Sequence, residues 1–144
     1  MNNPKILILD EPTAGLDPKE RVKFRNLISA LAENRIVILS THIVSDVEYI
    51  AKEILIMKNG ELLHQGSPET ILQPIQSFVW ECDVTRQEAE RLEESYVVAN
   101  LKHGIEAERL RIISEVPPCK TAWNVEPTLE DLYLYYFSEV SDNE

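Results

Sequence analysis

The sequence has few residues of the kinds that build disulfide frameworks, metal clusters and membrane spans. Only two of its 144 residues are cysteines, Cys82 and Cys119, and they form no C-x-x-C pair. This usage excludes a zinc cluster or a disulfide framework and is typical of a reducing compartment. The aliphatic runs are strand-sized, whereas a transmembrane helix needs about 20 apolar residues; these runs are Ile6–Leu9, Ile36–Leu39 and Ile54–Met57.

Basic residues and glycines are also scarce. Fourteen Lys and Arg face 25 Asp and Glu, which gives a formal net charge of -11. An acidic chain without a basic patch repels phosphate backbones, so we expect no nucleic-acid partner. The four glycines do not form a G-x-x-x-x-G-K-[ST] loop, which excludes the backbone cradle that grips nucleotide phosphates.

Residues 5–66 read as alternating strands and helices. Ile6–Leu9 and Ile36–Leu39 are continuous aliphatic runs, which predicts parallel strands buried on both faces. Between them, Asp17 supplies an N-cap and Pro18 a first helical residue, which predicts a helix that ends near Asn34. This order is typical of a layered α/β domain.

The next segments predict a short helix, a hairpin and a domain boundary. Ser45 and Glu48 have the spacing of a capping box, and Asn59-Gly60 suits the tight turn of a hairpin. Ser67-Pro68 opens one more predicted short helix, which Gln73-Pro74 ends. We place the domain boundary there, which gives domains 1–74 and 75–144.

Residues 75–144 predict a small α+β domain. Apolar and charged residues alternate from Phe78 to Val84, which indicates a strand with one wet face. A charged helix over 85–94, further strands over 96–101 and 109–113, and a last helix capped by Thr128 follow. No residue of this region has a spacing that suggests catalysis.

Polar residues follow each of the two buried strands. Asp10 and Glu11 come directly after the first strand, and His42 lies two residues beyond Ser40, where the second strand ends. Ligands of open α/β sheets collect at the carboxyl ends of strands. One carboxylate there could hold Mg²⁺ while the other orients a water, and His42 could contact a terminal phosphate. The alternative is that the two carboxylates only begin the turn before Pro12.

Four features in order resemble the ATP-binding-cassette (ABC) ATPase family. The run from Ile6 to Glu11 resembles the Walker B strand, and Pro12-Thr13 continues it as in that family. Residues 14–17, Ala-Gly-Leu-Asp, resemble the D-loop, and His42 lies where the family keeps its switch histidine.

The resemblance implies a role for each matching residue. Asp10 would bind Mg²⁺ through water, Glu11 would act as general base, His42 would sense the γ-phosphate, and Asp17 would contact the opposing subunit. It also implies ATP as ligand, a second ABC ATPase subunit and a transmembrane permease as partners, and a cytoplasmic protein peripheral to the membrane. The implied fold is α/β, a partial P-loop NTPase (RecA-like) core lacking its Walker A strand, followed by the small α+β domain.

The chain departs from the family because the Walker A loop and the signature sequence have no counterpart in it. We therefore expect a C-terminal fragment of an ABC ATPase that is inactive alone. The family's central strand is missing too, which predicts either direct pairing of Ile36–Leu39 with Ile54–Met57 or association with a second copy.

The last residues suggest a subfamily. The segment from Val125 to Tyr133 resembles the closing segment of ATPases that serve multidrug exporters, so the implied parent couples ATP hydrolysis to export. One alternative function is a non-catalytic dimerisation or regulatory module. Another is an ATPase of DNA repair or translation, which Ala14-Gly15 and the lack of basic segments disfavour. The transported substrate and the permease are not encoded in these residues.

Overall fold

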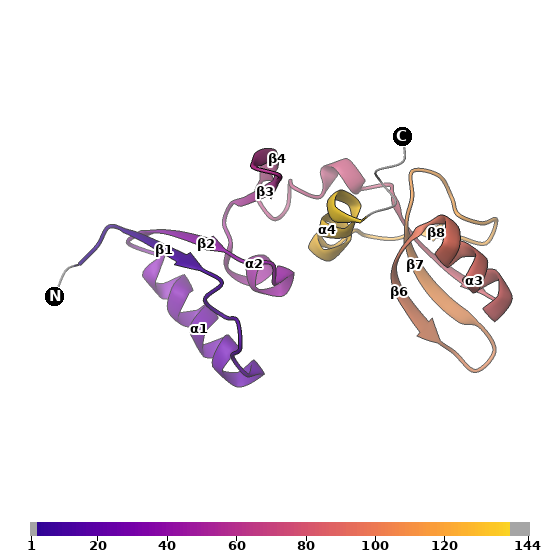
Figure 1. Ribbon diagram of the computed structural model, residues 1–144, viewed down its shortest axis with the longest axis horizontal. Coiled ribbons are helices and arrows are strands. Elements are labelled where there is room, and N and C mark those ends of the chain that lie inside the picture. The colour runs from indigo at the N-terminus through magenta and orange to yellow at the C-terminus, as the bar shows by residue number, and fades with distance from the viewer. Residues whose placement is uncertain (1–2, 139–144) are drawn as a thin grey trace. The chain divides into compact units, whose positions relative to one another are not determined.

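The computed structural model describes residues 3–138, which form two units divided between Pro68 and Glu69 (Figure 1). The first unit contains, in chain order, β1 (Ile6–Asp10), α1 (Pro18–Leu31), β2 (Ile36–Ser40), α2 (Val44–Ile50), β3 (Ile54–Lys58) and β4 (Glu61–Gly66). The second contains η1 (Gln73–Ile75), β5 (Val79–Val84), α3 (Arg86–Ser95), β6 (Val97–His103), β7 (Glu108–Ile113), β8 (Trp123–Asn124) and α4 (Leu129–Phe137). The division precedes the boundary expected at residue 74, because the segment with the fully buried Ile71 and Ile75 belongs to the second unit.

In the first unit β1 and β2 form a two-stranded parallel sheet. Their register runs from Ile6 opposite Ile36 to Asp10 opposite Ser40. The connecting helix α1 begins as predicted, because the Asp17 side chain accepts a hydrogen bond of 2.9 Å from the amide of Glu20. This cap satisfies an amide that a helix N-terminus otherwise leaves unpaired. The predicted strand–helix–strand order is therefore confirmed.

One face of this sheet is exposed to solvent, so the prediction of strands buried on both faces is wrong. Figure 1 shows α1 along one side of the sheet. The strand residues that alternate with the exposed ones are half-buried. Two strands and one connecting helix supply cover for a single face only. The outer face carries four isoleucines, Ile6, Ile8, Ile36 and Ile38, which are 54%, 72%, 61% and 51% exposed.

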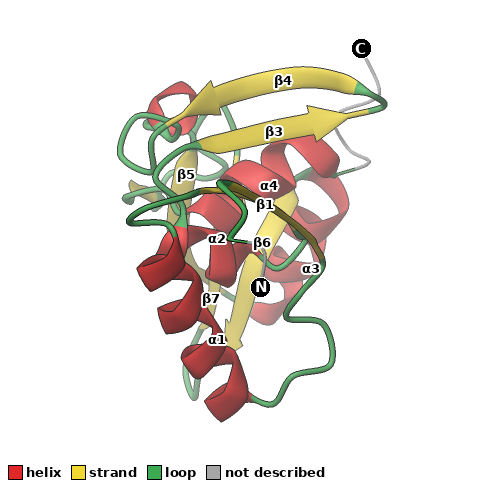
Figure 2. Cartoon of the chain, turned by 90° about the vertical axis from the view of Figure 1, so that its left-hand side faces the viewer, coloured by secondary structure: helices red, strands yellow, loops and turns green. Residues whose placement is uncertain are grey.

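The strands β3 and β4 form a separate antiparallel hairpin (Figure 2). Asn59 and Gly60 have φ angles of 53° and 81°, the left-handed conformations of a primed turn, which confirms the prediction for Asn-Gly. The predicted direct pairing of β2 with β3 is wrong, because β2 bonds to β1 and β3 bonds to β4. Association with a second copy stays a prediction.

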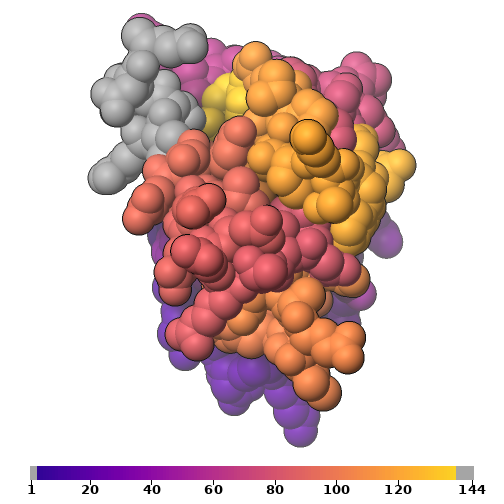
Figure 3. All heavy atoms as spheres, turned by 90° about the vertical axis from the view of Figure 1, so that its right-hand side faces the viewer, coloured from indigo at the N-terminus to yellow at the C-terminus, as the bar shows by residue number. Residues whose placement is uncertain are grey.

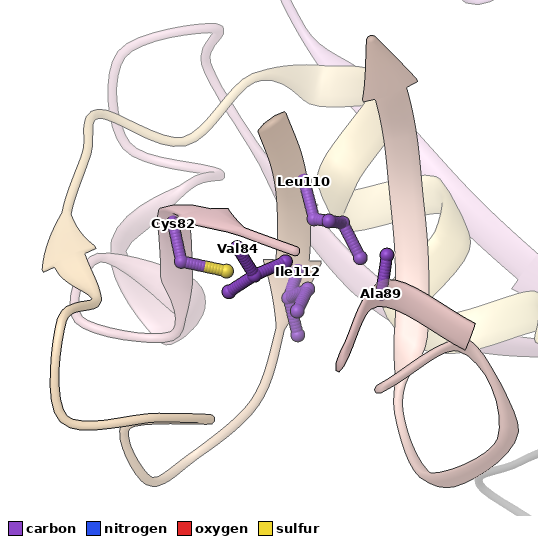
Figure 4. Packing of buried hydrophobic residues seen from close by; sticks show 5 residues of the cluster. All are labelled: Cys82, Val84, Ala89, Leu110 and Ile112. Carbon is purple, nitrogen blue, oxygen red and sulfur yellow. The ribbon is translucent and has the colours of Figure 1, made fainter. Parts of the chain in front are cut away.

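The second unit is built on a four-stranded antiparallel sheet in the order β6-β7-β5-β8. Its core gathers five buried side chains from β5, α3 and β7, which Figure 4 shows packed together: Cys82, Val84, Ala89, Leu110 and Ile112. The predicted strands and the helices of residues 85–94 and after Thr128 are present, and β8 is an additional strand.

The helices also required two corrections. The short helix expected from Ser67 is a series of turns followed by the 3-10 helix η1, which has Pro74 in its first turn. Helix α2 begins after Ile43, which makes no side-chain cap, so the capping box of Ser45 and Glu48 is wrong. Within residues 3–138 no helix has the length and apolar character needed to cross a membrane.

A buried ion pair fastens α4 to the sheet. The Arg111 guanidinium donates to Asp131 at 2.7 Å and 3.0 Å and to the Glu126 carbonyl at 2.7 Å. Asp131, which is 1% exposed, also accepts from the Thr128 amide at 2.7 Å and so closes the capping box of α4. Hydrogen bonding to Asp131 raises the pKa of Arg111, so the guanidinium stays charged. One carboxylate thus holds the helix start and its attachment to β7.

Replacing Asp131 with alanine should destabilise the second unit by about 3 kcal/mol, because Arg111 would remain charged without its main partner. Urea denaturation followed by the fluorescence of Trp80 and Trp123, both in this unit, measures the loss. Glu130→Ala, which removes an exposed neighbouring carboxylate, is the matched control and should change stability little. Equal effects of the two substitutions would show that the Arg111–Asp131 ion pair does not stabilise the attachment of α4 to the sheet.

Candidate functional site

The carboxyl ends of β1 and β2 bring acidic and hydroxyl side chains together. Asp10 and Ser40 are the last residues of their strands and lie opposite each other, and the Ser40 hydroxyl donates a hydrogen bond to the Asp10 carboxylate. The amide of Glu11 donates to the Ser40 carbonyl at 2.8 Å, which extends the ladder by one bond. The two predicted carboxylates therefore sit at the junction of the strands.

Glu11 adopts a backbone conformation that is unusual for a residue with a side chain. Its φ angle is 45°, in the left-handed region that non-glycine residues rarely occupy. Such conformations persist only where surrounding contacts fix them, and they cluster at functional sites. Here the conformation ends β1 abruptly and places the Glu11 carboxylate next to the segment that follows β2.

Three groups from that segment contact the Glu11 carboxylate. The amide of His42 donates at 3.0 Å, the His42 Nδ1 atom lies 2.8 Å from Oε1, and the Thr41 hydroxyl donates at 3.2 Å. The contact with His42 is the main cause that lowers the pKa of Glu11 below its ordinary value. Glu11 is therefore a carboxylate at neutral pH, and it orients an imidazole whose side chain is 72% exposed.

The fourth predicted residue, Asp17, is not part of this group. Its carboxylate accepts from the Glu20 amide as the N-cap of α1, and its carbonyl accepts from Arg21 at 2.9 Å. The turn that leads to it contains Gly15 at a φ of 79°, with open space around the position of a Cβ atom. The structure thus joins Asp10, Glu11 and His42 and leaves Asp17 on the neighbouring turn.

Sequence reasoning missed a buried network that begins in the turn after Glu11. The Thr13 hydroxyl donates to Asp46 Oδ2 at 2.5 Å, and these residues are 1% and 0% exposed. Arg25 of α1 lies 3.8 Å from the other Asp46 oxygen and stacks over the Tyr49 ring at 4.6 Å. The network ties the turn after Glu11 to α2, which follows His42. No local pattern in the sequence marks it, because its members lie on three different segments of the chain.

The residues at the strand ends can supply only part of the coordination shell of a magnesium ion. Within residues 3–138 no three His, Cys, Asp or Glu side chains converge on a position for a metal. Asp10 with the adjacent Ser40 hydroxyl offers oxygen ligands from one side, which suits Mg²⁺ that keeps water and phosphate oxygens as its other ligands. These residues do not enclose the ion on all sides.

Similarity to known proteins indicates the class of protein to which this chain is related. No protein-family model matches the chain. Its curated relatives are ATP-binding proteins of ABC transporters, so the chain is homologous to the ATP-binding subunits of this transporter class.

Three relatives illustrate the similarity. The uncharacterized ABC transporter ATP-binding protein YxlF of Bacillus subtilis is 34% identical over 99 residues, 69% of this chain and 34% of the relative. The energy-coupling factor transporter ATP-binding protein EcfA2 of Enterococcus faecalis is 37% identical over 75 residues, 51% of this chain and 26% of the relative. EcfA2 of Staphylococcus saprophyticus is 46% identical over 71 residues, 48% of this chain and 25% of the relative. The aligned part of this chain thus spans 25–34% of the length of these relatives.

Replacing His42 with alanine should raise the pKa of Glu11 toward its ordinary value of 4.5, because the main group that stabilises the carboxylate is removed. In the native chain the Glu11–His42 contact stabilises the folded state above the ordinary glutamate pKa, and this stabilisation is lost as the pH falls through the lowered pKa. An NMR titration of the Glu11 side-chain carbonyl carbon measures the Glu11 pKa in the native chain and in the variant. His64→Ala, a histidine substitution in the β3–β4 hairpin, should leave the Glu11 pKa unchanged; a shift of equal size there would contradict the assignment.

Replacing Thr13 with valine should destabilise the first unit by about 2 kcal/mol, because a buried carboxylate oxygen of Asp46 loses its hydrogen bond. Amide hydrogen exchange of α2 and β2 should accelerate by about thirtyfold if these amides exchange through opening of this unit. Ser45→Ala, at an exposed position of α2, is the control and should leave exchange near the native rate. Unchanged exchange in Thr13→Val would remove the network from the stability of the unit.

Proposed function

We propose that residues 5–66 form the hydrolytic half of an ABC transporter ATPase site, in which Glu11 and His42 act on the attacking water and the terminal phosphate of ATP. The observation that carries the proposal is the pairing of an ionised, conformationally constrained Glu11 with an exposed His42 at the ends of adjacent strands. Homology to ATP-binding subunits of ABC transporters supports the same class of reaction.

Each residue has a role that its contacts allow. Glu11, held as a carboxylate, accepts a proton from a water or orients it for attack. His42 keeps one ring nitrogen on Glu11, so its other ring nitrogen can approach a phosphate oxygen. Asp10 and Ser40 offer oxygens to the hydration shell of Mg²⁺, the ion that neutralises phosphate charge in this chemistry.

The proposed reaction needs groups that these 144 residues do not contain. They hold no Walker A loop, so the phosphates have to be gripped by a further segment of polypeptide. In the proposed assembly that segment completes the site, a second ATPase subunit contacts the turn that carries Asp17, and a transmembrane permease receives the energy at the cytoplasmic face of the membrane.

We propose export as the direction of transport. This part rests on the resemblance of the closing segment, Val125 to Tyr133, to exporter ATPases. In the structure that segment includes the capped start of α4, where Asp131 binds Arg111. Substrate choice resides in the permease and is not encoded in these residues.

A non-catalytic dimerisation or regulatory module is the second candidate. The exposed isoleucines on the outer face of the β1–β2 sheet favour it, because contiguous apolar surface is typical of interaction sites. The two candidates differ in what they require of Glu11, since only hydrolysis depends on its carboxylate.

A chimaera tests the proposal: the aligned residues of this chain replace their counterparts in the Bacillus subtilis relative, which supplies the remaining sequence. We expect magnesium-dependent ATP hydrolysis, and Glu11→Gln should lower kcat by about a hundredfold or more while ATP still binds, because only the water-activating group changes. Glu20→Gln, an exposed carboxylate of α1, is the matched control and should hydrolyse normally.

The isolated chain provides the complementary measurement. It should show no ATP turnover above that of its own Glu11→Gln variant, because its phosphate grip is missing. Native turnover by the Glu11→Gln chimaera would remove Glu11 from the mechanism. A chimaera without turnover, together with a concentration-dependent dimer of the isolated chain, would instead support the module.

A further inference from the structure

The two cysteines of the chain belong to the same core of the second unit. Cys82 lies in β5 with no exposed surface, and its sulfur points into the core cluster (Figure 4). Cys119 lies on the loop between β7 and β8 and is half-buried. Both are free thiols. Their separation along the sequence argued against a disulfide framework, but the fold removes that separation.

The sheet register explains how they meet. β8 pairs antiparallel with β5, with Trp123 opposite Glu81 and Asn124 opposite Trp80. Continuing this register by one residue brings the chain just before β8 alongside Cys82. Cys119 packs against the cluster that contains Cys82, and its proximity is one of the causes that raise the pKa of Cys82. The contact is made wholly within one unit.

We propose that Cys82 and Cys119 form a reversible intramolecular disulfide when the chain meets a small-molecule disulfide such as oxidised glutathione, and that this bond fastens the loop of residues 114–122 to β5. The proposal does not depend on the proposed ATPase function. It assigns a site of covalent modification to a pair of thiols that the proposed ATPase function does not use.

The reaction proceeds in two exchange steps. The Cys119 thiolate attacks one sulfur of oxidised glutathione, which forms a mixed disulfide and releases one glutathione thiolate. The Cys82 thiolate then attacks the Cys119 sulfur, which closes the protein disulfide and releases the second glutathione. The two protein thiols lose two protons and two electrons, and the electrons reduce one small-molecule disulfide to two thiols.

The surroundings determine the order of the steps. Cys119 is reachable from solvent, and its sulfur lies 3.4 Å from the Thr121 hydroxyl. Burial, followed by the adjacent Cys119, Asp83 and Glu88, raises the pKa of Cys82 to about 12. Cys82 is therefore a poor first nucleophile, because the thiolate is the reactive form. It acts as the resolving thiol, since contact in the fold keeps it next to the Cys119 sulfur at a high effective concentration.

The bond would add a covalent restraint to a loop that hydrogen bonds at Ser114 and packing of Cys119 and Ala122 already hold. The loop leaves β7, passes through turns and returns as the two-residue strand β8; its orange chain forms part of the surface in Figure 3. A disulfide between residues 82 and 119 closes a long chain segment and so lowers the conformational entropy of the unfolded state. The oxidised second unit should therefore unfold at a higher temperature than the reduced one.

The test starts from the reduced full chain, incubated with oxidised glutathione, alkylated and digested without reduction. Mass spectrometry should find one cross-linked peptide pair that joins Cys82 to Cys119 in monomeric chain, and dithiothreitol should reverse it. The thermal midpoint of the second unit should rise on oxidation and return on reduction. The cross-link should form faster in the folded chain than in chain unfolded by urea.

Two variants separate the roles of the thiols. Cys82→Ala should stop at a stable mixed disulfide on Cys119, whereas Cys119→Ser should leave Cys82 unmodified in the folded chain. Circular dichroism establishes that each variant is folded, and Cys119→Ser stands as an independent arm because its site is half-exposed. A native chain that stops at the mixed disulfide, that forms only dimers through Cys119, or that cross-links no faster than unfolded chain would overturn the proposal.

Discussion

The left-handed backbone of Glu11 is the constraint on which the geometry of the candidate site depends. It ends β1 in a single residue and turns the carboxylate toward the segment after β2, where His42 and Thr41 contact it. One side chain thereby links two strands that are separated by a whole helix in the sequence. The lowered pKa of Glu11 follows from these contacts, so conformation and charge at the site have the same cause.

A buried carboxylate bound to a threonine hydroxyl recurs in both units. Asp131 has complete partners, since a guanidinium and the capping groups of α4 donate to it at hydrogen-bond distance. Asp46 has one short bond, from Thr13, while Arg25 stays at 3.8 Å, beyond hydrogen-bond range. Burial of a carboxylate costs free energy unless hydrogen-bond donors surround it, so the burial of Asp46 is less well compensated than that of Asp131.

Local sequence signals predicted much of the fold. Contacts between residues far apart in the chain could not be predicted from the sequence. The caps at Asp17 and Thr128 depend on residues within one helical turn, so their patterns were readable. The meeting of Asp10, Glu11 and His42 followed from the rule that parallel strands end at one edge. The bare sheet face, by contrast, depends on how many elements are available to cover it. Partners far apart in the chain, Thr13 with Asp46 and Cys82 with Cys119, gave no local signal.

The exposed isoleucine face has a consequence for the electrostatics of the site. Alternation along β1 and β2 places Asp10 and Ser40 on the same face as the isoleucines, at its carboxyl end. Any surface that covers this face also displaces water from around Asp10. With less water, the effective dielectric constant falls, and the attraction of Asp10 for a cation strengthens. The hydration of the apolar face therefore controls how strongly the carboxylate can hold a charge beside it.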